Sequence, residues 1–156
     1  MPGDLDGLII NNGHVGDHEL TCLRGLTRLR GLSLVDCWKI TDSGLLHLRG
    51  LTALQSVLIE GSRIGDSGLE HLQVLPALRY LYLENTQVTS AGLSTLQNFP
   101  ALRSCALWHT DMIGDAGLVH LGRLTKLETL YLTGTKISDA GLSKIKNYLP
   151  DCTIIK

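Results

Sequence analysis

The sequence predicts an α/β solenoid, in which short parallel strands and short helices alternate along the 156-residue chain. One observation is internal repetition, because periods of about 20 to 50 residues indicate solenoids and similar arrays. The second is that each copy changes from apolar residues at every second position to apolar residues at every third, as expected for a strand followed by a helix. Each copy is therefore predicted to form strand, turn, helix and return.

Six copies share the pattern LxxLxLxxTxITDxGLxxLxxL and account for the whole chain, which we interpret as a single domain of residues 1–156. Their first leucines are spaced 24, 25, 24, 24 and 25 residues apart. A further edge strand is expected near residues 152–156, with Cys152 and an isoleucine in core positions. The copies begin at Leu5, Leu29, Leu54, Leu78, Leu102 and Leu127.

Two polar or small columns recur between strand and helix. Acidic residues fall at the expected first helical turn, where a carboxylate can accept backbone hydrogen bonds and oppose the helix dipole. A glycine follows inside each helix although glycine there costs about 1 kcal/mol relative to alanine, so we expect a close approach to the neighbouring coil. The acidic residues are Asp42, Asp66, Asp115 and Asp139, with Thr41, Ser90 and Ser138 beside them or in their place, and the glycines are Gly44, Gly68, Gly92, Gly117 and Gly141.

The repeat resembles the leucine-rich repeat family, and within it the ITDxGL type of F-box substrate receptors and of many short bacterial repeats. The sixth copy, LETLYLTGTKISDAGLSKI, follows the pattern closely, while the fifth has Cys105 at a leucine position. The resemblance covers essentially the whole chain. It implies a right-handed arc with a concave parallel sheet and convex helices, and recognition of a protein partner on the concave sheet.

Stacked copies should align the outward residues of the strands in columns across the concave face. Four of the seven aromatic residues fall in these columns, which indicates an interaction surface, although aromatic residues also suit strands for purely structural reasons. A lengthened turn after the second strand makes Trp38 a possible contact at the rim. The residues predicted to bind a partner on the concave face are Tyr80, Tyr82, Glu84, Trp108, Tyr131, Leu58 and Glu60.

The start of the chain has acidic residues and a short apolar run where a signal peptide needs basic residues and a longer one, so we expect a cytoplasmic protein or an excised domain. Fourteen basic and fifteen acidic residues give a net charge of −1 without like-charged runs, so we expect neither nucleic acid nor a membrane as partner. We expect no cofactor and no metal site, because Cys22, His47 and His71 lie on helices too far apart to share a zinc ion. The four widely spaced cysteines are expected to be reduced.

Catalysis is not expected. His109, Asp111 and Glu84 form the one cluster considered, but no nucleophile or glycine-rich phosphate loop accompanies them. A second function of a different class stays open: a structural or self-associating segment of a larger solenoid with no separate ligand. Terminal coils of a solenoid expose core unless they are capped, and no polar cap is evident in the sequence, so a homodimer through an uncapped end is one expectation.

Overall fold

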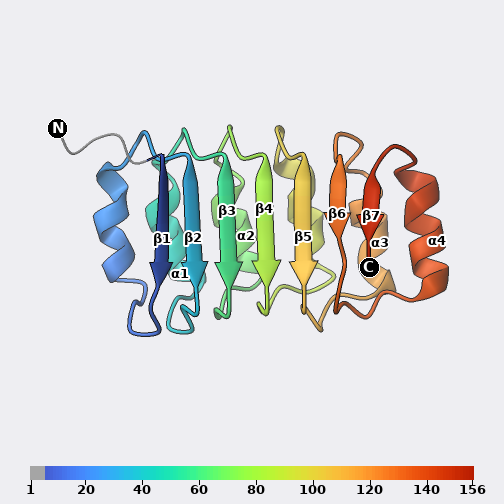
Figure 1. Cartoon of the computed structure of the whole chain (residues 1–156), viewed down its shortest axis with the longest axis horizontal. Coiled ribbons are helices and arrows are strands. Elements are labelled where there is room, and N and C mark those ends of the chain that lie inside the picture. Colours follow the sequence, from blue (N-terminus) through green and yellow to red (C-terminus); the bar gives the residue numbers. More distant parts are fainter. Residues whose placement is uncertain (1–5) are drawn as a thin grey trace.

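The computed structural model describes residues 6–156 as one layer of parallel strands backed by one layer of helical segments (Figure 1). The seven strands follow one another in the sheet in chain order, each hydrogen-bonded to the next. Leu5, the expected start of the first copy, lies outside the described residues. The strands are β1 (Gly7–Asn11), β2 (Gly31–Val35), β3 (Ser56–Glu60), β4 (Tyr80–Glu84), β5 (Ser104–Trp108), β6 (Thr129–Tyr131) and β7 (Thr153–Ile155).

The helical layer is shorter and more tightly wound than the sequence predicts. Only α4 reaches ten residues, and several segments are 3₁₀-helical, because a copy of 24 residues leaves few positions between two strands. These segments lie behind the sheet in Figure 1. They are η1 (Glu19–Gly25), α1 (Asp42–Leu45), η2 (Leu46–Leu48), α2 (Asp66–Leu72), η3 (Gly92–Asn98), η4 (Asp115–Gly117), α3 (Leu118–Leu121) and α4 (Asp139–Tyr148).

The strand registers agree with the predicted columns. Tyr80 pairs with Ser56 on one side and Ser104 on the other, and Tyr82 pairs with Leu58 and Ala106. The alternating leucines point the other way, toward the helices, and form a continuous buried core with the helical leucines. One face of the sheet is therefore left without a helix, and we call it the open face; it is the face that the sequence predicts to be concave.

A ladder of hydrogen bonds joins every coil to the next at the start of its helical segment. The first-turn aspartates were expected to cap their own helices, and their position is confirmed, but their carboxylates instead accept from the backbone N–H of the following coil. Thr41 and Ser138 do cap their own helices. The acceptor and donor pairs are Asp17 and Thr41, Asp42 and Gly65, Asp66 and Thr89, Ser90 and Gly114, and Asp115 and Ser138, with oxygen to nitrogen distances of 2.8, 2.7, 2.8, 3.0 and 2.8 Å.

The same ladder explains the glycine column. A Cβ added to Gly44 would lie 2.5 Å from the carboxylate of Asp17, and one added to Gly68 would lie 2.7 Å from that of Asp42. Contacts that short do not occur between unbonded atoms, so a larger residue would displace the carboxylate from the N–H that it accepts. The expected close approach is confirmed. A carboxylate of the preceding coil approaches these two glycines as well as Gly92 and Gly141, whereas a Cβ at Gly117 would meet Leu93 first.

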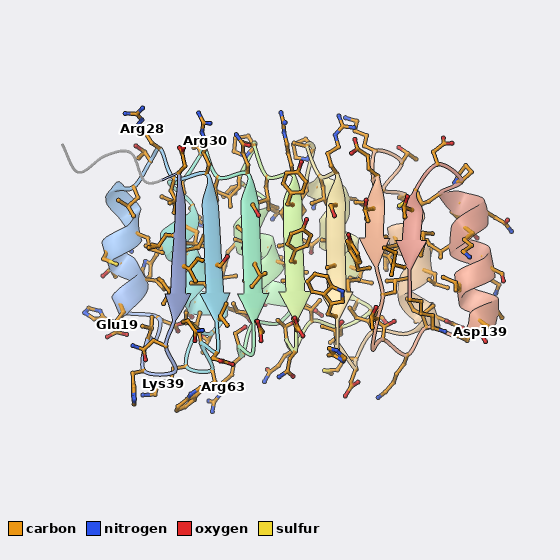
Figure 2. All side chains as sticks on the ribbon, in the orientation of Figure 1. Glu19, Arg28, Arg30, Lys39, Arg63 and Asp139 are labelled. Carbon is orange, nitrogen blue, oxygen red and sulfur yellow. The ribbon has the colours of Figure 1, made fainter. Side chains whose placement is uncertain are left out.

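Both ends of the ladder are closed by charged side chains. Gly16 occupies the donor position of the first coil, and its N–H donates to Glu19, at 2.9 Å, which stands where the other coils have glycine. At the other end, Asp139 accepts from the ammonium group of Lys156, also at 2.9 Å. Figure 2 shows Glu19 and Asp139 at opposite ends of the molecule along the same edge of the sheet. The end coils thus satisfy with their own side chains what a neighbouring coil would supply.

A double-mutant cycle at Asp66 and Gly92 tests the ladder. Asp66→Ala leaves the Thr89 N–H without its acceptor and should lower the free energy of unfolding by about 1 to 3 kcal/mol. Gly92→Ala should also destabilise, because its new Cβ meets that carboxylate. The double variant should lose less than the sum, since removing the carboxylate makes room for the methyl group; denaturation by urea measures all three.

Gly25→Ala is the matched control, because a Cβ at Gly25 meets no atom within 4 Å. It should leave the unfolding midpoint nearly unchanged. Strictly additive losses at Asp66 and Gly92 would contradict the idea that the glycine column exists to admit the carboxylates.

The ladder also predicts an acid-sensitive step at Asp115. Hydrogen bonds donated by the hydroxyl and the N–H of Ser138 hold the pKa of Asp115 below its ordinary value of 3.8. Because the folded pKa is depressed, the ionised carboxylate stabilises the fold above the ordinary value, and that stabilisation disappears as the pH falls through the folded pKa. In Ser138→Ala the pKa of Asp115 should rise, as measured by NMR titration of the carboxyl carbon; an unchanged midpoint would show that the hydroxyl does not hold the carboxylate.

Candidate functional site

Four aromatic side chains form a continuous row on the open face. The ring centroids of Tyr80 and Tyr82 lie 6.5 Å apart, those of Tyr82 and Trp108 lie 5.7 Å apart in a stacked arrangement, and those of Trp108 and Tyr131 lie 5.4 Å apart. The row therefore crosses β4, β5 and β6. The structure thus brings together the four aromatic residues that the sequence assigns to the site, and we call these four residues the aromatic row.

The rings pack on one another as well as facing solvent, which the sequence pattern alone does not reveal. Tyr80 is 40% exposed, whereas the other three members of the row are partly buried. Ala106 lies between Tyr82 and Tyr131 in register and is fully buried although it points to the open face. Its small side chain leaves room for the large neighbours to meet above it, and this alanine between two tyrosines was the available sequence signal.

Two carboxylates lie beside the row at the end of its strands. Glu60 and Glu84 pair in register on β3 and β4, and Glu84 in turn pairs with Trp108. Burial raises the pKa of Glu60, and the neighbouring carboxylates of Glu84 and Asp36 raise it further. Within residues 6–156 neither glutamate has a hydrogen-bond or ion-pair partner. Like charges directly opposite one another on adjacent strands are destabilising, so this pair is not explained by stability.

The other predicted contacts lie around this centre in different ways. Leu58 is partly buried beside Tyr82, in register with it, and so extends the apolar surface toward β3. Trp38 is 50% exposed on the turn after β2, with the ammonium group of Lys39 5.0 Å from its ring centroid, and no ring contact joins it to the aromatic row in the described part of the chain. Leu58 therefore adjoins the aromatic row, while Trp38 is a separate rim feature.

A shallow hollow adjoins the opposite end of the row. It has a volume of about 440 Å³ and is lined by Arg79, Tyr80, Pro100, Ala101, Arg103 and Glu128. Arg103 already pairs with Glu128 at 3.3 Å, so this cation is partly committed within the protein. The open face thus has arginine side chains where its central strands begin and glutamates where they end.

The candidates for metal binding have other partners. His47 accepts a hydrogen bond from Arg24 at 3.1 Å, and the guanidinium of Arg49 lies 3.2 Å from a ring nitrogen of His71. These contacts link consecutive coils on the helical side of the molecule. Among residues 6–156 no group of three or more histidine, cysteine or acidic side chains is placed to hold a metal ion.

His109, one of the three residues considered for catalysis, lies at a strand-ending turn. His109 is exposed and adopts a left-handed conformation with φ of 50°, in the same column as Asn85, which has φ of 48°, and Gly134, which has φ of 76°. The column marks the turn that ends each strand.

Burial raises the pKa of Cys105 to about 12, with a smaller contribution from Cys152, so the Cys105 thiol stays protonated and unreactive at neutral pH.

Comparisons with known proteins agree with this architecture. A family model described as Leucine Rich repeat matches residues 123–146. An internalin (inlF) from Listeria monocytogenes is 23% identical over 96% of this chain and 47% of its own, with a TM-score of 0.65. Internalin C2 from the same organism is 27% identical over 86% of this chain and 55% of its own, with a TM-score of 0.59. The tropomodulin C-terminal domain of Caenorhabditis elegans is 15% identical over 96% of this chain and 85% of its own, with a TM-score of 0.54.

No curated protein matches the chain. The fold and the open face define an α/β solenoid of stacked strand-helix coils. The matched copy and the similar internalins support a leucine-rich repeat solenoid. The chain spans about half the length of the two internalins.

Its fold is consistent with a protein-interaction module, and proteins of this kind are typically non-catalytic. None of the helices within residues 6–156 has the length and apolarity that a membrane span requires.

The two faces of β4 should respond differently to truncation. Leu83 is fully buried, so Leu83→Ala should lower the free energy of unfolding by about 2 to 5 kcal/mol. Tyr80→Ala removes one exposed ring and one aromatic contact, and should cost about 0.5 to 1.5 kcal/mol. Thermal unfolding followed by circular dichroism compares the two; losses of equal size would contradict the strand register.

Proposed function

We propose that the protein is a non-catalytic recognition module that binds a protein partner on its open face, with the aromatic row at the centre of the contact. The observation that carries this proposal is the row itself. Four adjacent aromatic side chains lie on the uncovered face of the sheet, outside the leucine core, and such a surface indicates an interaction site. Tyrosine and tryptophan offer a large contact area, a polar group and little rotamer entropy, and they dominate binding hot spots.

Ring packing makes this surface suited to binding. Side chains that already rest on one another lose less conformational freedom when a partner arrives, so more of the contact energy remains as affinity. Leu58 widens the apolar centre, while Glu60 and Glu84 supply polar groups at its border. The hypothesis keeps Trp38 as an accessory contact for a partner large enough to reach the rim.

The alternative function is self-association through the ends of the stack. It is favoured by Leu8 and Ile10, which are only partly buried on β1, and by the exposed Ile155 on β7. Against it stands the closure of the ladder by Glu19 and Lys156. Light scattering after gel filtration separates the two proposals, because the recognition module is expected to be a monomer and an end-to-end assembly a dimer that Ile155→Asp disrupts.

Partner capture with a matched pair of variants tests the recognition module. Immobilised wild-type protein should retain a partner from a lysate of the source organism, and Tyr82→Ala combined with Trp108→Ala should lose it. Binding of the purified partner should weaken at least about a hundredfold, as expected when two hot-spot residues are truncated. Calorimetry with the purified components measures the change.

The control is Val74→Ala, because Val74 is 48% exposed on the turn that follows α2, away from the open face. It should bind like the wild type. Retention of the same proteins by the wild type and the aromatic double variant would show that the open face is not the working surface.

A further inference from the structure

We infer that the partner presents an arginine side chain to the open face, held between the carboxylates of Glu60 and Glu84 and the adjoining rings of Trp108 and Tyr82. This inference rests on the proposed function and names the chemistry of its partner: a basic peptide segment, either a flexible tail or an exposed loop.

The registers place the four groups around one position. Glu60, Glu84 and Trp108 follow one another in the same column of β3, β4 and β5, and Tyr82 precedes Glu84 by two residues on the same face of β4. Adjacent strands are about 4.8 Å apart, so the two carboxylates can be reached by a single forked group. A guanidinium is planar and offers several donors, which allows it to bond carboxylates and stack on an aromatic ring simultaneously.

Charge balance supports a cation at this position. Glu60 and Glu84 lie opposite each other without a hydrogen-bond or ion-pair partner among the described residues, and Asp36 adds a third carboxylate nearby. The basic residues that follow Asp36 and Glu60 in the chain do not compensate them: Figure 2 shows Lys39 and Arg63 extending away from the sheet at its lower edge. A cation from outside relieves the repulsion and can gain attraction to an aromatic ring beside the carboxylates.

The aromatic row makes the position more than an acidic cluster. The rings of Tyr82 and Trp108 are stacked, with their centroids 5.7 Å apart, and they form an apolar border on one side of the carboxylates. A charged group beside such a border is partly screened from water, so its interactions with the carboxylates are stronger than on an open surface. Arginine also tolerates this position better than lysine, because a guanidinium is more weakly hydrated than an ammonium group.

A phage-displayed library of random peptides provides the probe. Peptides are chosen that bind the wild-type protein and do not bind the Trp108→Ala variant. Each is synthesised in two forms, one as selected and one with citrulline, the neutral isostere, in place of each arginine. Isothermal titration calorimetry with the otherwise unchanged protein compares the affinities of the two peptides. Citrulline should weaken binding about tenfold, equivalent to about 1.4 kcal/mol.

Two isosteric variants locate the cation. In Glu60→Gln and Glu84→Gln the preference for arginine over citrulline should fall, and in the double variant the two peptides should bind alike. The matched control is Glu70→Gln, since Glu70 is exposed on α2, outside the open face. Its preference for arginine should equal that of the wild type.

The outcomes separate this inference from the proposed function. Selected peptides that need Trp108 but bind equally well with citrulline, or that carry only lysine, would overturn arginine recognition and leave the recognition surface intact. A preference for arginine that survives both glutamine substitutions would place the cation elsewhere and overturn the inference. Failure to select any peptide that depends on Trp108 would count against the proposed function and the inference together.

Discussion

The architecture depends on one repeated hydrogen bond. In it, a backbone N–H of each coil donates to a side-chain oxygen at the start of the helical segment of the preceding coil. It fixes the separation of two coils at the edge of the stack, where the ends of the strands and the starts of the helices meet. A carboxylate at this position requires an empty place in the next helix, which is why glycine recurs there despite its low helix propensity. Ser90 preserves the bond with a hydroxyl, so the acceptor matters more than the charge.

The geometry of the open face is a consequence of this fixed stacking. Because neighbouring coils keep the same register, residues at one position of the repeat fall in one column, and a large side chain on one strand meets its counterpart on the next. The aromatic row and the glutamate pair are both products of that alignment. The core leucines are constrained by packing, whereas the open-face residues are free to differ between copies.

Much of this arrangement follows from period alone. The spacing of the leucines predicts the strands, their direction, and the columns to which Tyr80, Tyr82 and Trp108 belong. The roles of the aspartates do not follow, because a residue at the first turn looks the same in sequence whether it serves its own helix or the next coil. The burial of Ala106 can be read only after the copies are aligned, because it depends on the size of Tyr82 and Tyr131, which lie a full copy away on either side.

At both ends of the ladder, a side chain of the end coil occupies the place of a neighbouring coil. Glu19 occupies the glycine column, and its carboxylate takes the place that a preceding coil would fill with an aspartate. A coil of the same design docked there would bring a second carboxylate to one N–H, with like charges in contact. Lys156 likewise takes the last acceptor, Asp139, from any following coil. Docking a further coil of this design at either end therefore requires one of these two side chains to be displaced.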